Sequence, residues 1–566
     1  MDREGAVETQ TWRCGVTCLD VRTRNKVEWR DPEWADHVDP AQLWHWVDAR
    51  ARPGERMVVV AHNLAYDLRI SQAFTWLPRL GWQLDRIRPD GEQTFARWRN
   101  GRRTITCIDS MAWFPVGLDR IADDVGMVKP RLPGNHAPTS VWLDRCRADV
   151  AILREAWRRV LQWLRDEDLG VWQPTGAGQA WSAWRHRHLT DKVLVGDDPE
   201  IREMERGALW CGRSEAWKHG RATGGPFTDW DVEAAYLRIM RDCEVPVRPL
   251  ARIVGPDDRD LRRWRDVACV LARVDVTTDR PVVPARGPHG SYWPTGTFTT
   301  TVWDPELDLL DSVDAKYRVT ECVVYTRRPA LASFARWLWP LATGTDDSVD
   351  PVVRRVAKHW SRAIVGRFGV RYHAWQPYGD AIEPGCELVP FTDLATGERT
   401  RLLTVGTSCL IETGQIEGDN AVPSVLGWIM SETRRRLWVT MLDAGLDHVL
   451  HVDTDGLLVD AQGSANLIAA GKAGLRIKGE YRAVEVIAPR QVVYGGTLRA
   501  PGVPRRSRRE SARVWTGQTW SRLSTELATG TPDRVQIRPR RIVLKGADHR
   551  RVHLPNGATE SIACIE

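Results

Sequence analysis

Two aspartates stand one residue apart in the stretch HVDTDGLLVD, which covers positions 451 to 460. The apolar runs on either side predict two strands, and Asp455-Gly456 is a strong signal for the turn of a hairpin. A turn alone can require these residue types for its backbone angles. Alternatively, Asp453 and Asp455 are carboxylate ligands at the tip of a hairpin, where they would bind divalent metal ions.

A further carboxylate, Asp231, ends another predicted strand in FTDWDVEAAY, and Tyr236 follows five residues later. Carboxylates from two strands can hold a pair of divalent ions about 3.5 to 4 Å apart. Mg²⁺ prefers such oxygen ligands, and substrate phosphates complete its coordination. One ion would activate an attacking hydroxyl and the other would neutralise a leaving pyrophosphate. The expected cofactor is therefore Mg²⁺, as two ions, with Mn²⁺ as an alternative.

Between these acidic segments, residues 351–369 predict a helix with one apolar and one cationic face. The apolar face gathers Val353, Val356, Ala357, Trp360 and Ile364. The opposite face gathers Arg354, Arg355, Lys358 and Arg362. Like charges at i, i+4 and i+8 repel by roughly a few tenths of a kcal/mol per pair. A nucleoside triphosphate bound against this face would relieve that repulsion, whereas a solvated basic face is the simpler interpretation.

In this order, the three segments resemble motifs A, B and C of family B DNA polymerases, and most closely the protein-primed branch of bacteriophages and linear plasmids. The first motif, Asp-x-x-Ser-Leu-Tyr, matches residues 231–236. The second, Lys-x-x-x-Asn-Ser-x-Tyr-Gly, matches residues 358–366, although Arg362 replaces its asparagine and Val365 its tyrosine. The third, Tyr-x-Asp-Thr-Asp-Ser, matches residues 451–456.

The resemblance implies a role for each matching residue. Asp231 and Asp455 would be metal ligands and catalytic residues, with Asp453 as a supporting carboxylate. Tyr236 would be the steric gate that excludes a ribose 2′-hydroxyl. The incoming nucleotide would also contact Lys358, Arg354, Arg362 and Gly366. Contacts to DNA would come from Trp210, Gly212 and Arg213 in ALWCGR, and from Tyr494 in RQVVY, where Val492 replaces an expected lysine.

The N-terminal segment resembles the 3′–5′ exonuclease lobe of the same family. AHNLAYD supplies Asn63 and Asp67 of the second exonuclease motif, and Ser110 lies in a stretch, IDSMAWFPVGLDRIADDVGM, similar to one that binds single-stranded DNA. Glu8, Asp67 and Asp149 would be the metal ligands of this lobe. However, Ala6 replaces the aspartate of the first motif, and Arg145 replaces the tyrosine of the third. Two-metal hydrolysis needs the full carboxylate set, so we expect weak or absent proofreading.

These residues must be positioned by several lobes, because 566 residues are too many for one core and imply roughly three to five domains. We expect an α/β and α+β multidomain chain, with a ribonuclease-H-like exonuclease lobe followed by a right-hand polymerase of palm, fingers and thumb. A Gly-rich stretch at 218–227 is expected to be a joint. The predicted domains are an exonuclease-like domain (1–185), a first palm segment (186–255), an insertion like the first terminal-protein region (256–330), fingers (331–370), a second insertion (371–408), a second palm segment (409–500) and thumb (501–566).

Composition is that of an ordinary globular protein. The net charge is +6, and dense basic stretches at 504–513 and 538–545 are typical of phosphate contacts, or simply of a solvated face. The eleven cysteines are scattered without a CxxC pair, which fits a reducing cytoplasm. No apolar run is long enough for a membrane span. We expect a phage- or plasmid-encoded protein in the cytoplasm of a bacterial host.

The function predicted from these motifs is DNA-directed DNA polymerisation, with priming by a protein expected from the resemblance alone. The partners would be a DNA primer-template, deoxynucleoside triphosphates and a terminal protein primer. Two alternatives stay open at this point: a non-catalytic nucleic-acid-binding relative, and a nuclease that acts through the N-terminal lobe.

Overall fold

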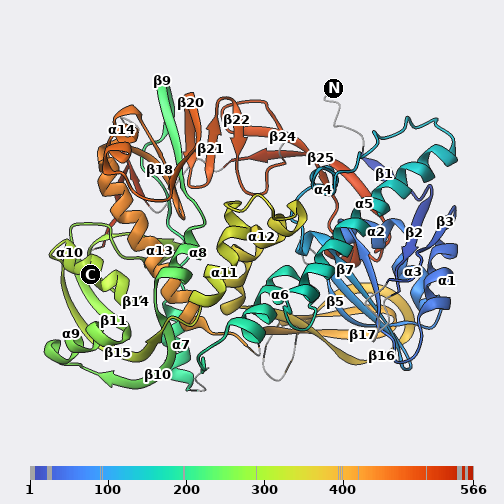
Figure 1. Cartoon of the computed structure of the whole chain (residues 1–566), viewed down its shortest axis with the longest axis horizontal. Helices are drawn as coiled ribbons and strands as arrows, with labels where there is room; N and C mark the ends of the chain where they lie inside the picture. Colours follow the sequence, from blue (N-terminus) through green and yellow to red (C-terminus); the bar gives the residue numbers. More distant parts are fainter. Residues whose placement is uncertain are drawn as a thin grey trace.

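The computed structural model describes residues 7–21, 29–89, 91, 94–194, 198–288, 290–392, 394, 397, 399–418, 420–504, 506–544, 551–554 and 559–564. Helices and strands are mixed along the whole chain, and several sheets lie side by side along the long axis of the molecule (Figure 1). No helix in these ranges is both long enough and apolar enough to cross a membrane.

The N-terminal lobe contains a four-stranded sheet in the order β4-β7-β6-β5. β4 (Met57–Ala61) and β7 (Arg103–Asp109) are parallel, while β6 (Phe95–Asn100) and β5 (Gln83–Arg88) continue the sheet in antiparallel fashion. Buried side chains join the sheet to α1 (Pro40–Arg50), α2 (Leu64–Ile70) and α3 (Ala73–Arg79). The long amphipathic helix α5 (Thr139–Asp166) packs beside α4 (Leu118–Val125).

A seven-stranded sheet, here called the central sheet, has the order β22-β21-β20-β9-β19-β18-β8. Its central strand, β9 (Gly220–Val232), pairs with β20 (Leu475–Ala488) on one side and β19 (Gly456–Val459) on the other. The outer strands are β22 (Thr497–Arg499), β21 (Gln491–Tyr494), β18 (Val449–Asp453) and β8 (Ser214–Ala216). The predicted joint at 218–227 is wrong, because residues 220–227 form the first half of β9.

Helices cover this central sheet and connect it to the N-terminal lobe. α13 (Pro423–Ala444) packs on α8 (Ala235–Asp242) and α14 (Ala461–Ala470). α11 (Ala332–Thr343) and α12 (Pro351–Phe368) pack on each other, and α12 also contacts α5 and α6 (Gly176–Ala183). Figure 1 shows α12 between the central sheet and α5. Segments far apart in the sequence are thus joined around the end of β9.

A second sheet, in the order β10-β15-β11-β14-β28, lies on the opposite side of α13 from the N-terminal lobe (Figure 1). It contains β10 (Val245–Val254), β11 (Cys269–Thr278), β14 (Thr295–Trp303) and β15 (Lys316–Arg328), with α9 (Asp258–Val267) and α10 (Asp304–Ser312) between strands. The residues at 256–330 form most of this sheet. Their assignment as a terminal-protein-binding insertion stays a prediction.

A long antiparallel hairpin extends from α12 along the N-terminal lobe. It consists of β16 (Arg371–Thr392) and β17 (Arg399–Glu417), and both strands contact β5. The predicted second insertion, 371–408, lies in this hairpin, although β17 continues to residue 417. The role assigned to that segment remains a prediction.

The two ends of the chain meet different sheets from those expected. β1 (Glu8–Gln10) pairs with β25 (Val535–Val543), which continues to β24 (Val514–Trp520) and β23 (Arg508–Arg509). Past residue 550, β28 (Ala563–Cys564) pairs with β14 in the second sheet. The C-terminus accordingly lies near β14 in Figure 1, away from β24 and β25. The described residues of the predicted thumb, 501–566, therefore contribute to more than one sheet, and its assignment as a thumb stays a prediction.

Candidate active site

Strand pairing brings Asp231 and Asp455 together, although 224 positions separate them in the sequence. β9 and β19 are antiparallel neighbours, and Gly456 lies opposite Asp231 in their register. The amide of Val232 donates to the carbonyl oxygen of Asp455 at 3.2 Å. Both carboxylates line one cavity of about 550 Å³, together with Asp453 and Asp229. The convergence expected from the motifs is present.

The turn that carries the two aspartates has constraints of its own. Thr454 adopts a left-handed backbone conformation, with φ of 62°, which is uncommon for a β-branched residue. Its amide donates to the carbonyl oxygen of Arg213 at 2.7 Å, and the amide of Asp455 donates to the carbonyl oxygen of Asp453 at 2.8 Å. A Cβ on Gly456 would lie 2.8 Å from the carbonyl oxygen of Trp230. Glycine thus permits the close approach of the two acidic strands.

The electrostatics of the cavity favour a bound cation. Burial and the neighbouring Asp231 raise the pKa of Asp455 to about 6, and burial also raises the pKa of Asp453. Two cations from β20 partly balance the carboxylates. Arg476 Nη2 lies 3.1 Å from Asp231 Oδ2, and Lys478 Nζ lies 3.9 Å from Asp231 Oδ1. Closely spaced, partly desolvated carboxylates repel each other, and a divalent ion would relieve that repulsion.

The donor set fits hard divalent ions that share their ligands with a substrate. Among the residues described, no group of three or more His, Cys, Asp or Glu side chains suited to a metal is found. Asp231 and Asp455 would therefore supply two carboxylates, and phosphate oxygens would supply further ligands. That division is typical of Mg²⁺ sites that bind phosphorylated substrates.

Helices α12 and α8 supply the opposite wall of the cavity. The predicted apolar face of α12 is confirmed, because Val353, Val356, Ala357, Trp360 and Ile364 are all buried. Lys358 and Arg362 line the cavity, as does Tyr236 from α8. Partial burial, together with the charges of Arg476 and Arg362, lowers the pKa of Lys358. Burial and Asp455 raise the pKa of Tyr236 to about 12, so its hydroxyl stays protonated.

The other cations of α12 do not reach this cavity. Arg354 Nη2 donates to the carbonyl oxygen of Asp346 at 2.8 Å, and Arg355 Nη2 donates to Asp124 at 2.8 Å. Gly366 is exposed and is also absent from the cavity lining. The predicted nucleotide contacts of Arg354 and Gly366 therefore do not fit this geometry, whereas those of Lys358 and Arg362 do.

Tyr494, one of the predicted DNA contacts, lines the same cavity. Arg499 stacks over its ring at 4.6 Å and donates to Asp229 Oδ2 at 3.1 Å. Sequence reasoning missed several cations of this lining, namely Arg476, Lys478, Arg490 and Arg499. The spacing of Arg476 and Lys478, two apart on one strand, places them on one face, which was a usable signal.

The predicted DNA contacts at 210–213 need correction. The side chain of Trp210 is buried, and its Nε1 donates to the carbonyl oxygen of Thr301 at 2.8 Å. Arg213 is only 1% exposed and forms an ion pair with buried Glu215. Gly212 packs against Thr454, because a Cβ there would lie 2.6 Å from the threonine hydroxyl. The side chains of Trp210 and Arg213 are therefore not available to DNA, and Gly212 packs behind the aspartate turn.

The exonuclease-like lobe assembles only some of its expected site. Burial, followed by the charges of Asp109 and Asp149, raises the pKa of Asp67 to about 8. Asp149 forms an ion pair with Arg145, the residue in place of the expected tyrosine. Glu8 is exposed on β1, which belongs to the sheet of β25 and not to the sheet of this lobe. Glu8 therefore lies outside the sheet of this lobe, and its role as a metal ligand stays a prediction.

Two further predictions in this lobe have different outcomes. Ser110 is fully buried and lies 2.8 Å from His62 Nδ1, so its side chain cannot contact DNA as expected. Asn63 is exposed and has a left-handed backbone, with φ of 81°. Asp109 was missed: its carboxylate accepts from the amides of Asn63 and Leu64, at 3.1 and 2.9 Å. Ala6 lies outside the residues that the structure describes.

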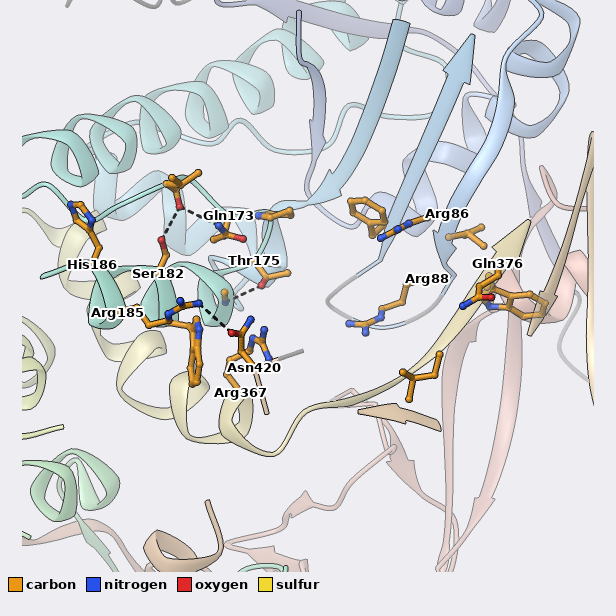
Figure 2. A pocket seen from close by; sticks show the side chains of 18 of the residues that line it. Arg86, Arg88, Gln173, Thr175, Ser182, Arg185, His186, Arg367, Gln376 and Asn420 are labelled. Carbon is orange, nitrogen blue, oxygen red and sulfur yellow. Dashed lines mark hydrogen bonds between the residues drawn. The ribbon is translucent and has the colours of Figure 1, made fainter. Parts of the chain in front are cut away.

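A second cavity, of about 870 Å³, lies where the N-terminal lobe meets α6 and the β16–β17 hairpin. Figure 2 shows Arg86 and Arg88 on one side, with Arg185 and Arg367 on the other. Trp181 and Trp375 contribute aromatic surface to the same lining. Cations interleaved with aromatic rings are the pattern that binds single-stranded nucleic acid.

Comparison with known proteins identifies the fold. No family model and no curated protein matches the sequence. Solved structures of Phi29 DNA polymerase do match, each covering 94% of this chain and 100% of the other. The orthorhombic crystal form matches with a TM-score of 0.67 at 13% identity. The binary complex with primer-template DNA has a TM-score of 0.65 and the ternary complex with primer-template DNA and incoming nucleotides 0.64, both at 14% identity. The predicted multidomain α/β architecture is thereby confirmed, and the chain has, over nearly its whole length, the fold of Phi29 DNA polymerase.

Proposed function

We propose that this protein is a DNA-directed DNA polymerase that extends a primer 3′-hydroxyl with deoxynucleoside triphosphates. The observation that carries the proposal is the meeting of Asp231 and Asp455 in one cavity whose opposite wall presents Lys358 and Arg362. Carboxylates on one side and cations on the other match the two demands of phosphoryl transfer, which are metal binding and phosphate binding. The shared fold with structures that hold primer-template DNA and incoming nucleotides supports the same substrate class.

In this proposal, each residue of the cavity has a separate task. Asp231 and Asp455 would hold two Mg²⁺ ions, or Mn²⁺ in their place, which would supply Lewis-acid stabilisation of the attacking and leaving oxygens. Lys358 and Arg362 would hold the triphosphate. Tyr236, whose side chain lines the cavity between these groups, would close the space that a ribose 2′-hydroxyl needs.

The cavity in Figure 2 supports a path for the template strand. Its rings and guanidinium groups can bind unpaired bases and phosphates without regard to sequence. We propose that the template passes there as a single strand before it reaches the site at Asp231. Priming from a protein hydroxyl follows from the motif resemblance, and comparing extension with and without a candidate terminal protein would test it.

We further propose that proofreading is weak or absent. Asp67, Asp109 and Asp149 are carboxylates of the N-terminal lobe that act on one another, but Arg145 already pairs with Asp149, and Asp109 accepts from two backbone amides. Labelled single strands should therefore survive incubation with this protein and Mg²⁺.

Primer extension with Mg²⁺ tests the main proposal. Asp455→Asn and Asp231→Asn should each abolish extension while the protein stays folded. Extension that is unchanged in Asp455→Asn would refute catalysis at this site, and a non-catalytic DNA-binding protein would then be the better description. Degradation of single strands that survives Asp231→Asn but is lost in Asp67→Ala would instead indicate a nuclease.

A further inference from the structure

The C-terminal residues 551–554 and 559–564, here called the C-terminal strap, cover the outer edge of the central sheet. They include the short hairpin of β26 (Arg551–His553) and β27 (Thr559–Ser561). Thr559 Oγ1 donates to the carbonyl oxygen of Ala216 at 2.8 Å, and its amide donates to that of Trp217 at 3.1 Å. The strap therefore caps β8, the edge strand of that sheet.

A buried charge cluster joins the strap to β8. Glu215, in the middle of β8, receives Arg551 Nη1 at 2.7 Å on one oxygen and the guanidinium of Arg213 on the other. Arg213, Glu215 and Arg551 are 1, 2 and 4% exposed. Burial opposes ionisation of Glu215, but the two guanidinium groups outweigh it and lower the pKa of this carboxyl. Arg551 also stacks over Trp217 at 4.4 Å.

The same cluster is directly linked to the aspartate turn. β8 pairs with β18, so that Ser214 lies opposite Asp453 and Glu215 opposite Val452. The carbonyl oxygen of Arg213 accepts from the amide of Thr454, whose left-handed backbone separates the two aspartates. A residue in such a conformation keeps it only when its surroundings impose it. β8 is three residues long and makes this contact from the sheet edge, where pairing alone restrains a strand weakly.

We propose that Arg551 is a positioning residue for the active site: by holding Glu215, and through it β8 and Arg213, it keeps the turn at 453–455 in the conformation that presents its carboxylates. The chain end thus acts on the reaction centre without touching substrate. This inference rests on the proposed polymerase function for its catalytic consequence, but its structural component does not.

Arg551→Met tests the proposal, because methionine keeps most of the apolar contact with Trp217 and removes the charge. We expect faster amide hydrogen exchange in a peptide that covers 449–459, measured on the metal-free protein by mass spectrometry. In primer extension, kcat should fall about tenfold or more, the scale on which misplaced groups reduce rate, while KM for the nucleotide changes less than about twofold. Arg551→Lys, which can still pair with Glu215, should recover most of both effects.

Arg534→Met is the matched control. Arg534 Nε pairs with Glu526, a carboxylate only 1% exposed, at 2.7 Å. Glu526 belongs to α15 (Leu523–Ala528), and Arg534 directly precedes β25, whose sheet does not include β8. This variant should leave exchange at 449–459 and kcat unchanged. The proposal is overturned if Arg551→Met changes neither the exchange at 449–459 nor kcat. It is also overturned if Arg534→Met and Arg551→Lys both change these two quantities as much as Arg551→Met does. If the unmodified protein extends no primer, the polymerase proposal fails, and the exchange comparison still decides whether the strap holds the turn.

Discussion

The cationic residues of α12 differ in their role, because only some of them line the active-site cavity. Lys358 and Arg362 line it, whereas Arg354 is bound to the carbonyl oxygen of Asp346. A charge-assisted hydrogen bond is worth roughly 1.5–3 kcal/mol, or about tenfold or more in binding. Arg362→Ala should therefore raise KM for nucleotides about tenfold in single-nucleotide extension. Arg354→Ala should change it less than about twofold, and equal effects would contradict the cavity assignment.

The raised pKa of Asp67 makes the stability of the fold depend on pH. Its carboxyl keeps its proton in the folded protein up to about pH 8, whereas the unfolded chain releases it near 3.8. Stability from this group is therefore complete below about pH 4 and is lost as pH rises towards 8. Asp67→Asn cannot ionise, so it should melt higher than the unmodified protein at pH 8, by an amount that shrinks towards pH 5.

Melting curves in the presence of a chelator would measure this difference. Asp123→Asn, at an exposed position in α4, is a suitable control and should show no such trend. A gap between Asp67→Asn and the unmodified protein that is constant from pH 5 to pH 8 would mean that Asp67 is ionised in the fold.

Residue types along the sequence were sufficient to predict the meeting of Asp231 and Asp455, but not the other side chains around their cavity. The strands that carry the first and third motifs, β9 and β19, are neighbours in the sheet, so the motif residues line one cavity. These residues are Asp231, Asp455, Lys358, Arg362 and Tyr236. Arg213 and Ser110 failed as DNA contacts because polarity does not reveal burial. Arg213 is accommodated inside by Glu215, and Ser110 by His62, and the sequence alone does not show which side chains will pair in this way.

At the level of elements, α12 was predictable because its apolar face has helical spacing. Strand β9 was not, since its glycines at 220–225 resemble a joint. Pairing with β20 satisfies the backbone there, and a Cβ on Gly225 would lie 2.5 Å from the carbonyl oxygen of Tyr481. Glycine is therefore needed for close packing of the strands. The position of Glu8 could not be predicted for a related reason, because the partner of β1 is β25, at the other end of the chain, and local sequence carries no sign of this pairing.

Helix α12 also connects the active site to the N-terminal lobe. Trp360 is fully buried, with ring centroids 5.0 Å from Trp163 and 6.2 Å from Trp113. Removing such a side chain typically costs about 3–5 kcal/mol. Trp360→Ala should therefore lower the urea midpoint, followed by circular dichroism, and weaken nucleotide binding as the helix loses its support. Unchanged urea resistance would show that the helix is held by other contacts.

At the level of the whole molecule, the chain crosses between lobes several times. β1 joins the sheet of β25, the β16–β17 hairpin lies along β5, and the C-terminal strap returns to the central sheet. The lobes expected from sequence as successive units are thus tied together by segments from both ends. Domain borders depend on these distant pairings and not on local composition, so the borders given from the sequence stay predictions.

The cavity between the N-terminal lobe and the β16–β17 hairpin should contribute to DNA binding by the assembled molecule. For single strands, each phosphate that a cation neutralises steepens the slope of log affinity against log salt by about 0.7. If the template passes this cavity, Arg86→Gln with Arg185→Gln should reduce that slope by about 1.4 for a primer-template with a long 5′ overhang. The slope for a blunt duplex should not change. Arg263→Gln, on exposed α9 far from this cavity, provides the control. Fluorescence anisotropy over a salt series would measure both slopes, and an equal loss on the two DNA substrates would place the overhang elsewhere.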